Sequence, residues 1–517
     1  MGESMEDERR YLIGADLGTT AVKVGLFDTD GRAVAVDTVE HTLITPATGV
    51  VEQSPDVYWG AFKTCLQRVL DTAGINRAAI LAMSLSVQGE TLTFLDADGE
   101  PMGNFIVWMD TRAQAEAEQI NAWFGAEEIL ERTGQGPIIS LYPAAKILWM
   151  RRNRPDVLAS TSRIVLLEDW FCLRLTGRAT GEPSLWCSSY MLDIRTCTWW
   201  PEMLERLGID ESMLPPVLPS GTSLGTILPE VADELGLPRT LRVVQGGLDT
   251  ACGTIGVGNV APGTFSESTG ALTTVCTMAD APVFDPEGEL ACFYGVEPGR
   301  YLLNMGAKGG IMFRWLRDQL FADELAAEQA GGQPAYEIMD ELAATVPAGS
   351  DGLVLLPHFE GAGAPDTNQY GKGLLYGLNL QHTRAHIARA FLEASAMNVR
   401  RMVDCTEAAT GQRIEEVRCL GGASNSPLWC QIKADVLGRR VVTMRNTQDA
   451  AALGAAMLAG VGAGVWKSVE QAAELTGAGG IDRTYRPDSA TREAYDKALR
   501  RYDLLVGAIS GIAKELY

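Results

Sequence analysis

A glycine turn between two strand-forming runs occurs once in each half of the chain, and this unit limits the folds open to it. The first run is YLIGADLGTTAVKVGLFD at 11–28, and the second is GTFSESTGALTTVCTM at 263–278. In each, residues typical of strands flank a glycine turn, which predicts a β-hairpin. The similarity between the two runs is weak, but it favours two domains of similar plan.

The length of the chain also indicates two domains. A single hydrophobic core stops growing near about 250–300 residues, and this chain has 517. We expect one domain over 10–257 and a second over 258–517. Strands are predicted at 81–86, 91–96 and 241–246, a loop at 215–223, and helices at 113–124, 143–154, 311–321, 386–405, 427–437 and 450–458. Alternating strands and helices predict an α/β fold.

Charge and composition exclude several classes of partner. The net charge of −23 repels nucleic acids and anionic membranes. Residues 1–10 are charged and lack the apolar core of a signal peptide. The longest apolar run, 450–466, is shorter than the ~20 residues that span a bilayer. The ten cysteines contain no C-x-x-C pair, so a zinc or thioredoxin site is not predicted. We expect a cytoplasmic protein.

The first motif with chemistry is Asp16-Leu17-Gly18-Thr19-Thr20, followed by Lys23. A glycine turn lets consecutive backbone N–H groups face a phosphate, and the two threonines add hydroxyl donors. The carboxylate at the strand end is suited to holding Mg²⁺ through water, and the lysine to neutralising charge. Taken alone, such a motif is more often a plain hairpin turn with solvated side chains.

Two further glycine motifs stand at predicted strand ends. Asp249 comes soon after Gly246-Gly247, where a carboxylate can accept the proton of a hydroxyl that attacks a γ-phosphate. Its structural alternative is a helix N-cap. The segment from Gly421 to Asn425 lies between a predicted strand and a helix, where glycines let a nucleoside approach the backbone. Its alternative is a tight turn with the asparagine as N-cap.

Other familiar signatures are absent or fail their context. No G-x-x-x-x-G-K-[ST] or G-x-S-x-G pattern occurs. Residues 256–261 fit G-x-G-x-x-A, but they follow a predicted helix rather than a strand, so a dehydrogenase is not favoured. Four histidines leave little basis for histidine triads or metal sites.

These pieces occur in the order found in the FGGY carbohydrate kinases, which the chain resembles from about residue 11 to 466. The most specific match runs from Gly373 to Leu378 and, after seven residues, from His386 to Glu393, with Phe391 larger than the usual residue. Supporting matches lie at 108–112, 142–149, 175–177, 309–318 and 449–456.

The resemblance implies two ribonuclease-H-like, actin-like domains with ATP and a sugar in the cleft between them. It assigns the first phosphate loop to Asp16, Gly18, Thr19, Thr20 and Lys23, and the second to Ser268, Thr269 and Gly270. It assigns the adenosine site to Gly309, Gly310, Gly421, Gly422 and Asn425. Asp249 is the implied base, Asp16 and Asp249 the implied Mg²⁺ ligands, and Gln88, Gly89, Glu90, Trp108, Asp110 and Asp249 the implied acceptor contacts.

The chain departs from its relatives at positions that affect the choice of substrate. Glycerol kinases have Q-R-E-T where this chain has Gln88-Gly89-Glu90-Thr91, and xylulokinases have Met-His at the middle two positions. We expect Gly89 to leave room for an acceptor larger than glycerol. In the second phosphate loop Ala271 replaces a threonine, and Thr269 or Thr273 is a candidate substitute.

The resulting hypothesis is an ATP- and Mg²⁺-dependent kinase of a small sugar or polyol, with a ketopentose such as xylulose first. Glycerol or a four-carbon polyol is the second choice. The alternative from another class is an actin-like nucleotide-binding scaffold without catalytic activity. No nucleic-acid or membrane partner is expected, and a homodimer is left open.

Overall fold

The computed structural model describes residues 9–270, 272–445 and 447–516, which fold into two compact units. The first unit contains the chain up to Val260 together with Met278–Leu302 and Gln448–Gly480. The second contains Ala261–Thr277, Leu303–Thr447 and the chain from Ile481 onward. Residues 448–480 therefore belong to the first unit, although they lie far beyond the predicted division at 257/258.

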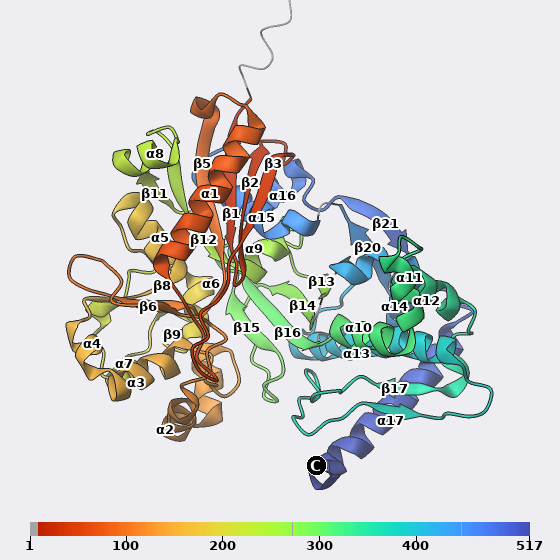
Figure 1. The fold of residues 1–517 in the computed structure, drawn as a ribbon. Coiled ribbons are helices and arrows are strands. Elements are labelled where there is room, and N and C mark those ends of the chain that lie inside the picture. Colours follow the sequence, from red (N-terminus) through yellow and green to blue (C-terminus); the bar gives the residue numbers. More distant parts are fainter. Residues whose placement is uncertain (1–8, 271, 446, 517) are drawn as a thin grey trace, which may run out of the picture. The chain divides into compact units, whose positions relative to one another are not determined.

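The first unit is built on a six-stranded sheet (Figure 1). Its strands, in spatial order, are β11 (Ser223–Thr226), β12 (Arg242–Leu248), β5 (Ile80–Val87), β1 (Tyr11–Leu17), β2 (Ala21–Asp28) and β3 (Ala33–Glu40). The three central strands β12, β5 and β1 run parallel, and the outer strands run antiparallel to their neighbours. The carboxyl ends of β1, β5 and β12 consequently meet at one edge of the sheet.

The remaining elements of the first unit surround this sheet. A smaller sheet has the order β4-β7-β6-β8. Its strands are β4 (Glu52–Gln53), β7 (Phe105–Ile106), β6 (Leu92–Leu95) and β8 (Arg163–Leu166), and the short strands β9 (Leu192–Asp193), β10 (Thr198–Trp199) and β15 (Ala291–Tyr294) lie elsewhere. The helices are α1 (Pro55–Ala73), α2 (Gln114–Thr133), α3 (Pro143–Asn153), α4 (Pro155–Ser160), α5 (Leu167–Thr176), α6 (Pro183–Trp186), α7 (Pro201–Leu207), α8 (Pro229–Leu235), α9 (Asp249–Gly256), α15 (Ala450–Gly462) and α16 (Val469–Thr476).

Glycine at Gly14 lets α15 pack directly on β1. A Cβ added to Gly14 would lie 1.8 Å from the carbonyl oxygen of Ala452, well inside van der Waals contact. The same helix approaches α9 closely, because a Cβ on Gly454 would lie 2.0 Å from the oxygen of Cys252. The alanine- and glycine-rich run that begins at 450 is thus a buried helix, as the sequence predicted.

The second unit has a sheet of the same plan. The sheet has seven strands, and six of them follow the order β16 (Tyr301–Lys308), β14 (Leu272–Ala279), β13 (Thr264–Thr269), β19 (Glu416–Leu420), β20 (Arg440–Met444) and β21 (Ile481–Tyr485). The pair β13–β14 is antiparallel, β13, β19 and β20 are parallel, and β21 is antiparallel to β20. This matches the pattern from β2 to β11 in the first unit, so both predicted hairpins are confirmed.

The helices of the second unit enclose its hydrophobic core. They are α10 (Gly310–Leu320), α11 (Ala322–Gln329), α12 (Ala335–Ala344), α13 (Arg384–Thr410), α14 (Pro427–Leu437) and α17 (Arg492–Leu516), with the strands β17 (Val354–Leu356) and β18 (Leu374–Tyr376) beside them. Core side chains include Phe321, Met339, Leu392 and Tyr502, each fully buried.

The predicted elements agree with the structure in kind, while several bounds differ. The helix predicted at 113–124 ends at a kink at Gly125, whose φ of +77° and ψ of 163° are not helical, and a second helical segment continues to Thr133. The helix predicted at 386–405 runs from Arg384 to Thr410. No helix within the described residues is both long and apolar enough to cross a bilayer.

The contact at Gly14 gives a testable stability prediction. Gly14→Ala should lower the free energy of unfolding by about 1–3 kcal/mol or more, because the new methyl forces α15 away from β1. Gly60 is the matched control: it lies within α1, and a Cβ there would meet nothing within 4 Å. Gly60→Ala should raise stability by about 0.5–1 kcal/mol. Urea denaturation measures both, and equal stability of the two variants would contradict the packing described.

Candidate active site

Three carboxylates come from the adjacent ends of the central strands of the first unit. Asp16 is the next-to-last residue of β1, Glu90 lies just beyond β5, and Asp249 directly follows β12 and begins α9. Because β5 lies between β1 and β12, the three side chains belong to one edge of the sheet. In open α/β sheets, ligands bind outside the carboxyl ends of parallel strands, so this edge is the candidate active site.

Asp16 and Asp249 influence each other. Burial raises the pKa of Asp16 to about 6, with the charge of Asp249 adding to the rise and the hydroxyl of Ser86 and the charge of Lys23 opposing it. The hydroxyl of Ser86 donates to Asp16 at 2.9 Å. Two carboxylates close enough for the charge of Asp249 to raise the pKa of Asp16 are suited to a shared divalent cation, since Mg²⁺ commonly binds through one or two carboxylates plus substrate phosphates.

Lys23 is engaged within the first unit. Its ammonium donates to a carboxylate oxygen of Asp449 at 3.0 Å and to the carbonyl of Gln448. The role predicted for Lys23 in binding phosphate stays a prediction, and in this structure the lysine anchors the start of α15.

The first phosphate loop is the turn between β1 and β2. The backbone N–H of Gly18 donates to Ala21 at 3.0 Å, and Thr20 is exposed. The buried Gln88 supports this turn, because its side chain donates to the hydroxyl of Tyr58 at 2.7 Å and to the carbonyl of Gly18 at 3.5 Å. These contacts give no support to the prediction that Gln88 touches the acceptor.

Glu90 has an unusual backbone and a half-buried side chain. Its φ of +54° lies in the left-handed region, which residues other than glycine rarely adopt. Burial raises the pKa of its carboxyl to about 7, a hydrogen bond from Ser188 and the charge of Lys146 oppose the rise, and Asp249 adds to it. A carboxylate held in a strained turn beside a hydroxyl is a common feature of ligand sites.

Side chains of two other segments lie close to Gly89. A Cβ at this position would lie 3.0 Å from a methyl carbon of Leu248 and 3.8 Å from the hydroxyl of Ser188. The expectation that Gly89 leaves room for an acceptor larger than glycerol stays a prediction.

Trp108 and Asp110, predicted together as acceptor contacts, differ in accessibility. Trp108 is half-buried, and its indole N–H donates to the hydroxyl of Thr19 at 2.8 Å. This leaves its ring available and links it to the first phosphate loop.

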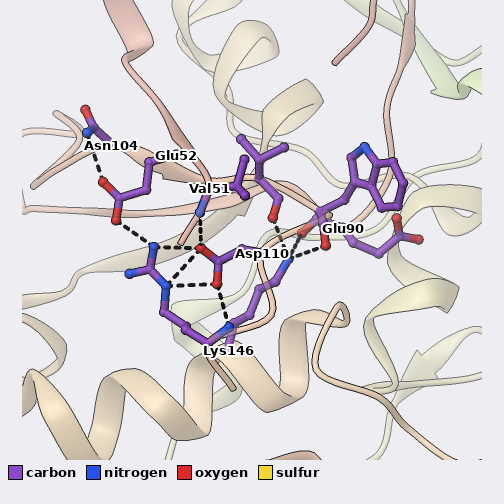
Figure 2. A network of polar contacts seen from close by, with 9 residues as sticks. Val51, Glu52, Glu90, Asn104, Asp110 and Lys146 are labelled. Atoms are coloured by element: carbon purple, nitrogen blue, oxygen red, sulfur yellow. Dashed lines mark hydrogen bonds and ion pairs between the residues drawn. The ribbon is translucent and has the colours of Figure 1, made fainter. Parts of the chain in front are cut away.

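Asp110 is fully buried, and both of its oxygens are occupied (Figure 2). They accept hydrogen bonds from the side chain of Arg112 at 2.7–3.0 Å and from the backbone of Val51 at 2.6 Å. Arg112 also donates to Glu52 at 2.7 Å. The prediction that Asp110 contacts the acceptor has no support in this geometry, which instead makes Asp110 an anchor of its own loop.

Asp249 is held at the start of α9. The backbone N–H and the hydroxyl of Thr250 both donate to its Oδ1, at 2.5 and 3.0 Å. Asp249 is not the N-cap of α9, because the N-cap residue is Leu248, which precedes it. Burial raises the pKa of Asp249, which makes its carboxylate a stronger base for a hydroxyl proton.

A buried polar network supports the glycine segment before Asp249. Glu168, fully buried, accepts the backbone N–H of Gly246 at 2.6 Å. The hydroxyl of Ser184 accepts the backbone N–H of Leu248 at 2.9 Å and donates to the buried Glu182 at 2.5 Å. Burial raises the pKa of both glutamates. Two buried acids thus fix the backbone that carries Asp249.

In the second unit, the residues predicted for the second phosphate loop and the adenosine site lie together. A Cβ on Gly310 would lie 2.3 Å from the carbonyl oxygen of Gly270, and one on Gly421 would lie 2.7 Å from that of Thr269 and 3.3 Å from the hydroxyl of Ser268. The N–H of Gly310 also donates to Gly270 at 2.9 Å. The glycines allow this close packing of three loops.

The structure bears on two expectations for these loops: a substitute for the missing threonine hydroxyl, and the N-cap of α14. Thr269 and Thr273 are buried and bond each other at 3.0 Å, so neither hydroxyl faces outward as a substitute for the missing threonine. Ala271 itself lies outside the described residues. Ser426, rather than Asn425, is the N-cap of α14, and Asn425 is exposed. Gly422 is exposed too, with nothing within 4 Å of an added Cβ.

A small cavity opens beside the glycine turn at the start of α10. Its lining combines aromatic and polar side chains: Thr273, Lys308, Gly309, Met312, Phe313, Pro357, Phe391, Ser395, Asn398 and Trp429. Phe391, the unusually large residue of the sequence signature, is one wall.

The most specific sequence motif has a structural role in the second unit. Arg389 and Glu393, one turn apart on α13, form a buried ion pair at 2.9 Å. Glu393 also accepts from the backbone of Gly349 at 2.9 Å and the hydroxyl of Ser350 at 2.8 Å. The motif therefore holds the helix against the loop before β17.

The sequence analysis missed the residues that support the site from behind. Glu168 and Glu182 were not among the predicted site residues. The charged pair Glu168-Asp169 within the apolar run 164–173 was a signal for the first of them. Lys146 entered the prediction only as part of the segment 142–149 that matches the family. The described residues contain no cluster of three or more His, Cys, Asp or Glu side chains arranged for a metal.

Comparison with known proteins agrees with this arrangement. Residues 11–256 match the N-terminal domain of the FGGY family of carbohydrate kinases, and residues 268–463 match the C-terminal domain. The xylulose kinase of Bacillus subtilis is 28% identical over 90% of this chain and 91% of its own. The autoinducer-2 kinase of Escherichia coli K12 is 28% identical over 95% of this chain and 93% of its own.

A solved structure shares the whole fold. The gluconate kinase of Lactobacillus acidophilus superposes with a TM-score of 0.89 at 26% identity, covering 99% of this chain and 100% of its own. Both units are therefore actin-like, ribonuclease-H-like domains, and the protein is a phosphotransferase with an alcohol group as acceptor rather than a scaffold without activity. The two family matches together cover most of the sequence, and the chain belongs to the FGGY family of carbohydrate kinases.

Proposed function

We propose that this sugar kinase transfers the γ-phosphoryl group of MgATP to a hydroxyl of a ketopentose, with D-xylulose as the first candidate. The observation that carries the proposal is the placement of Glu90 and Asp249 at one sheet edge, with the indole of Trp108 bonded to Thr19 in the turn after β1. A carboxylate accepts hydrogen bonds from two hydroxyls, and an indole face covers a carbon chain. The similarity to a xylulose kinase supports the choice of sugar.

Asp249 is the proposed base. Among the described residues, its hydrogen bonds go to Oδ1, which leaves Oδ2 to accept the proton of the attacking hydroxyl. Its raised pKa suits this task, because a stronger base takes the proton more readily. The buried network through Ser184 and Glu168 fixes its backbone, so little reorganisation is needed during the reaction.

The nucleotide is assigned to the glycine loops of both units. Gly18, Thr19 and Thr20 are proposed to contact phosphate in the first unit. Ser268, Thr269 and Gly270 are proposed as the second loop, and Gly309, Gly310, Gly421, Gly422 and Asn425 as the adenosine site. Mg²⁺ bound near Asp16 and Asp249 would neutralise charge on the transferred phosphoryl group. Cytoplasmic location remains a prediction.

Other acceptors remain alternatives. Relatives that act on autoinducer-2 and gluconate are about as similar to this chain as the xylulose kinase is. A smaller acceptor such as glycerol or a four-carbon polyol stays the second candidate. A kinase assay over ketopentoses, glycerol, tetritols and gluconate distinguishes them, and D-xylulose should give the highest kcat/KM.

Asp249→Asn tests the proposed base. The change should lower kcat by about 10²–10⁴ and leave ATP affinity within a few-fold, because the amide cannot take a proton. Coupled ADP production and nucleotide titration measure the two quantities. Asp233→Asn, at an exposed carboxylate paired with Arg239, is the control and should behave as wild type. Activity of Asp249→Asn within a few-fold of wild type would remove Asp249 from the mechanism.

Glu90→Gln tests the acceptor site. The amide keeps the shape but loses the charge, so kcat/KM for the best acceptor should fall about 10–100-fold while the KM for ATP stays constant. Glu234→Gln, whose exposed carboxylate pairs with Lys63, serves as the control. An unchanged ranking and efficiency over the acceptor panel would show that Glu90 does not contact the acceptor.

Ser184→Ala tests the support of Asp249. The substitution leaves the N–H of Leu248 and one oxygen of Glu182 without the partner that joins them. We expect kcat to fall about tenfold with little change in the KM for ATP, since about 1–3 kcal/mol is lost when a buried group is left unpaired. Ser212→Ala on the surface is the control. If Ser184→Ala lowered stability and nucleotide affinity as much as it lowered kcat, the result would instead indicate a general defect in folding.

A further inference from the structure

Lys146 on α3 gathers three backbone carbonyls with one buried ammonium group (Figure 2). Its side chain is fully buried, and Nζ donates to the carbonyl of Val107 at 2.9 Å, of Trp108 at 3.1 Å and of Glu90 at 3.3 Å. An ammonium has three N–H donors, so each donor has one carbonyl. Within the described part of the chain, no carboxylate oxygen lies within salt-bridge distance of Nζ.

The three carbonyls belong to two segments that are distant in sequence. One contains Glu90, in its left-handed conformation just beyond β5. The other follows β7 and contains Trp108, whose indole bonds Thr19 of the first phosphate loop. A strained backbone conformation persists only where its surroundings determine it, and the bond from Lys146 to the carbonyl of Glu90 is one such determinant.

The helix holds the second segment at another point. Trp149, one turn after Lys146 on α3, lies under the guanidinium of Arg112 at 5.0 Å. Arg112 in turn holds the buried Asp110. Thr91 adds a parallel connection, because its hydroxyl accepts the backbone N–H of Trp108 at 3.1 Å. The side chain of Lys146 donates hydrogen bonds to backbone carbonyls of both segments.

We propose that Lys146 is a positioning residue that holds the Glu90 segment and the Trp108 segment in the geometry that binds the acceptor. The proposal rests on the assignment of Glu90 and Trp108 to the acceptor site. Burial lowers the pKa of Lys146 to about 7 and raises that of Glu90 to about 7, while the charge of each group favours the ionised form of the other. The ionised carboxyl is the form that accepts two hydroxyl hydrogen bonds. The Trp108 segment reaches the first phosphate loop through one hydrogen bond, from its indole to Thr19, so we expect a smaller effect on the nucleotide than on the acceptor.

A lysine is better suited to this place than an arginine. Three carbonyls that converge on one point match the compact, rotatable donors of an ammonium, whereas a guanidinium presents a flat fork of donors. Methionine is the closest apolar replacement in length and flexibility. Glutamine keeps N–H donors without the charge.

The test combines kinetics with amide hydrogen exchange on the full chain. Lys146→Met should raise the KM for the best acceptor about 10–100-fold, lower kcat less, and leave the KM for ATP within about twofold. Amides at 88–91 and 106–111 should exchange faster than in wild type, while those of α1 and β3 should not change. Lys146→Gln should give a smaller effect in both measurements. Lys63→Met, at an exposed lysine paired with Glu234, is the control.

The outcomes separate this inference from the proposed function. If the wild-type enzyme phosphorylates no sugar or polyol of the panel, the proposed function fails, and the exchange rates still decide the role of Lys146 because they need no substrate. Unchanged exchange at both segments would overturn the inference. So would equal rises in the KM values for acceptor and ATP, or loss of nucleotide binding in both variants, since these indicate that Lys146 stabilises the whole first unit.

Discussion

The parallel pairing of β1, β5 and β12 is the constraint on which the chemistry of the first unit depends. The carboxyl ends of parallel strands lie at one edge of the sheet, so the residues at these ends lie close together. Asp16, Glu90 and Asp249 are brought together in this way from distant parts of the sequence. The approach of α15 to β1 at Gly14 packs the same sheet, and a side chain larger than hydrogen there would move the strand that carries Asp16.

Much of the fold followed from local patterns. Both hairpins, the buried helix at 450 and the elements around Asp249 were predictable because alternation, glycine turns and apolar runs are local signals. Asp16 and Asp249 stood out because each lies two residues from a glycine at a strand end. The predicted division at 257/258 could not foresee that residues 448–480 pack in the first unit, since this depends on helix–strand contacts across the whole chain.

The parts that could not be predicted are those set by side chains from other strands. The neighbour of Gly89 is Leu248 of β12, which the local sequence does not indicate. Asp110 matched a substrate motif, yet Arg112 and Val51 occupy its oxygens. Glu168 supports a backbone N–H that lies 78 residues away. In each case the decisive partner is remote in sequence, where pattern analysis of a single chain has no information.

The left-handed backbone of Glu90 has a consequence for how acceptor preference can evolve. Only glycine, and to a lesser degree asparagine and aspartate, adopt this conformation at low cost. A valine or leucine at position 90 would destabilise the turn however well it suited a new acceptor. Natural or laboratory evolution toward other acceptors is therefore channelled into the residues that surround Glu90, such as Ser188 and Leu248, whose side chains can be exchanged while the turn keeps its shape.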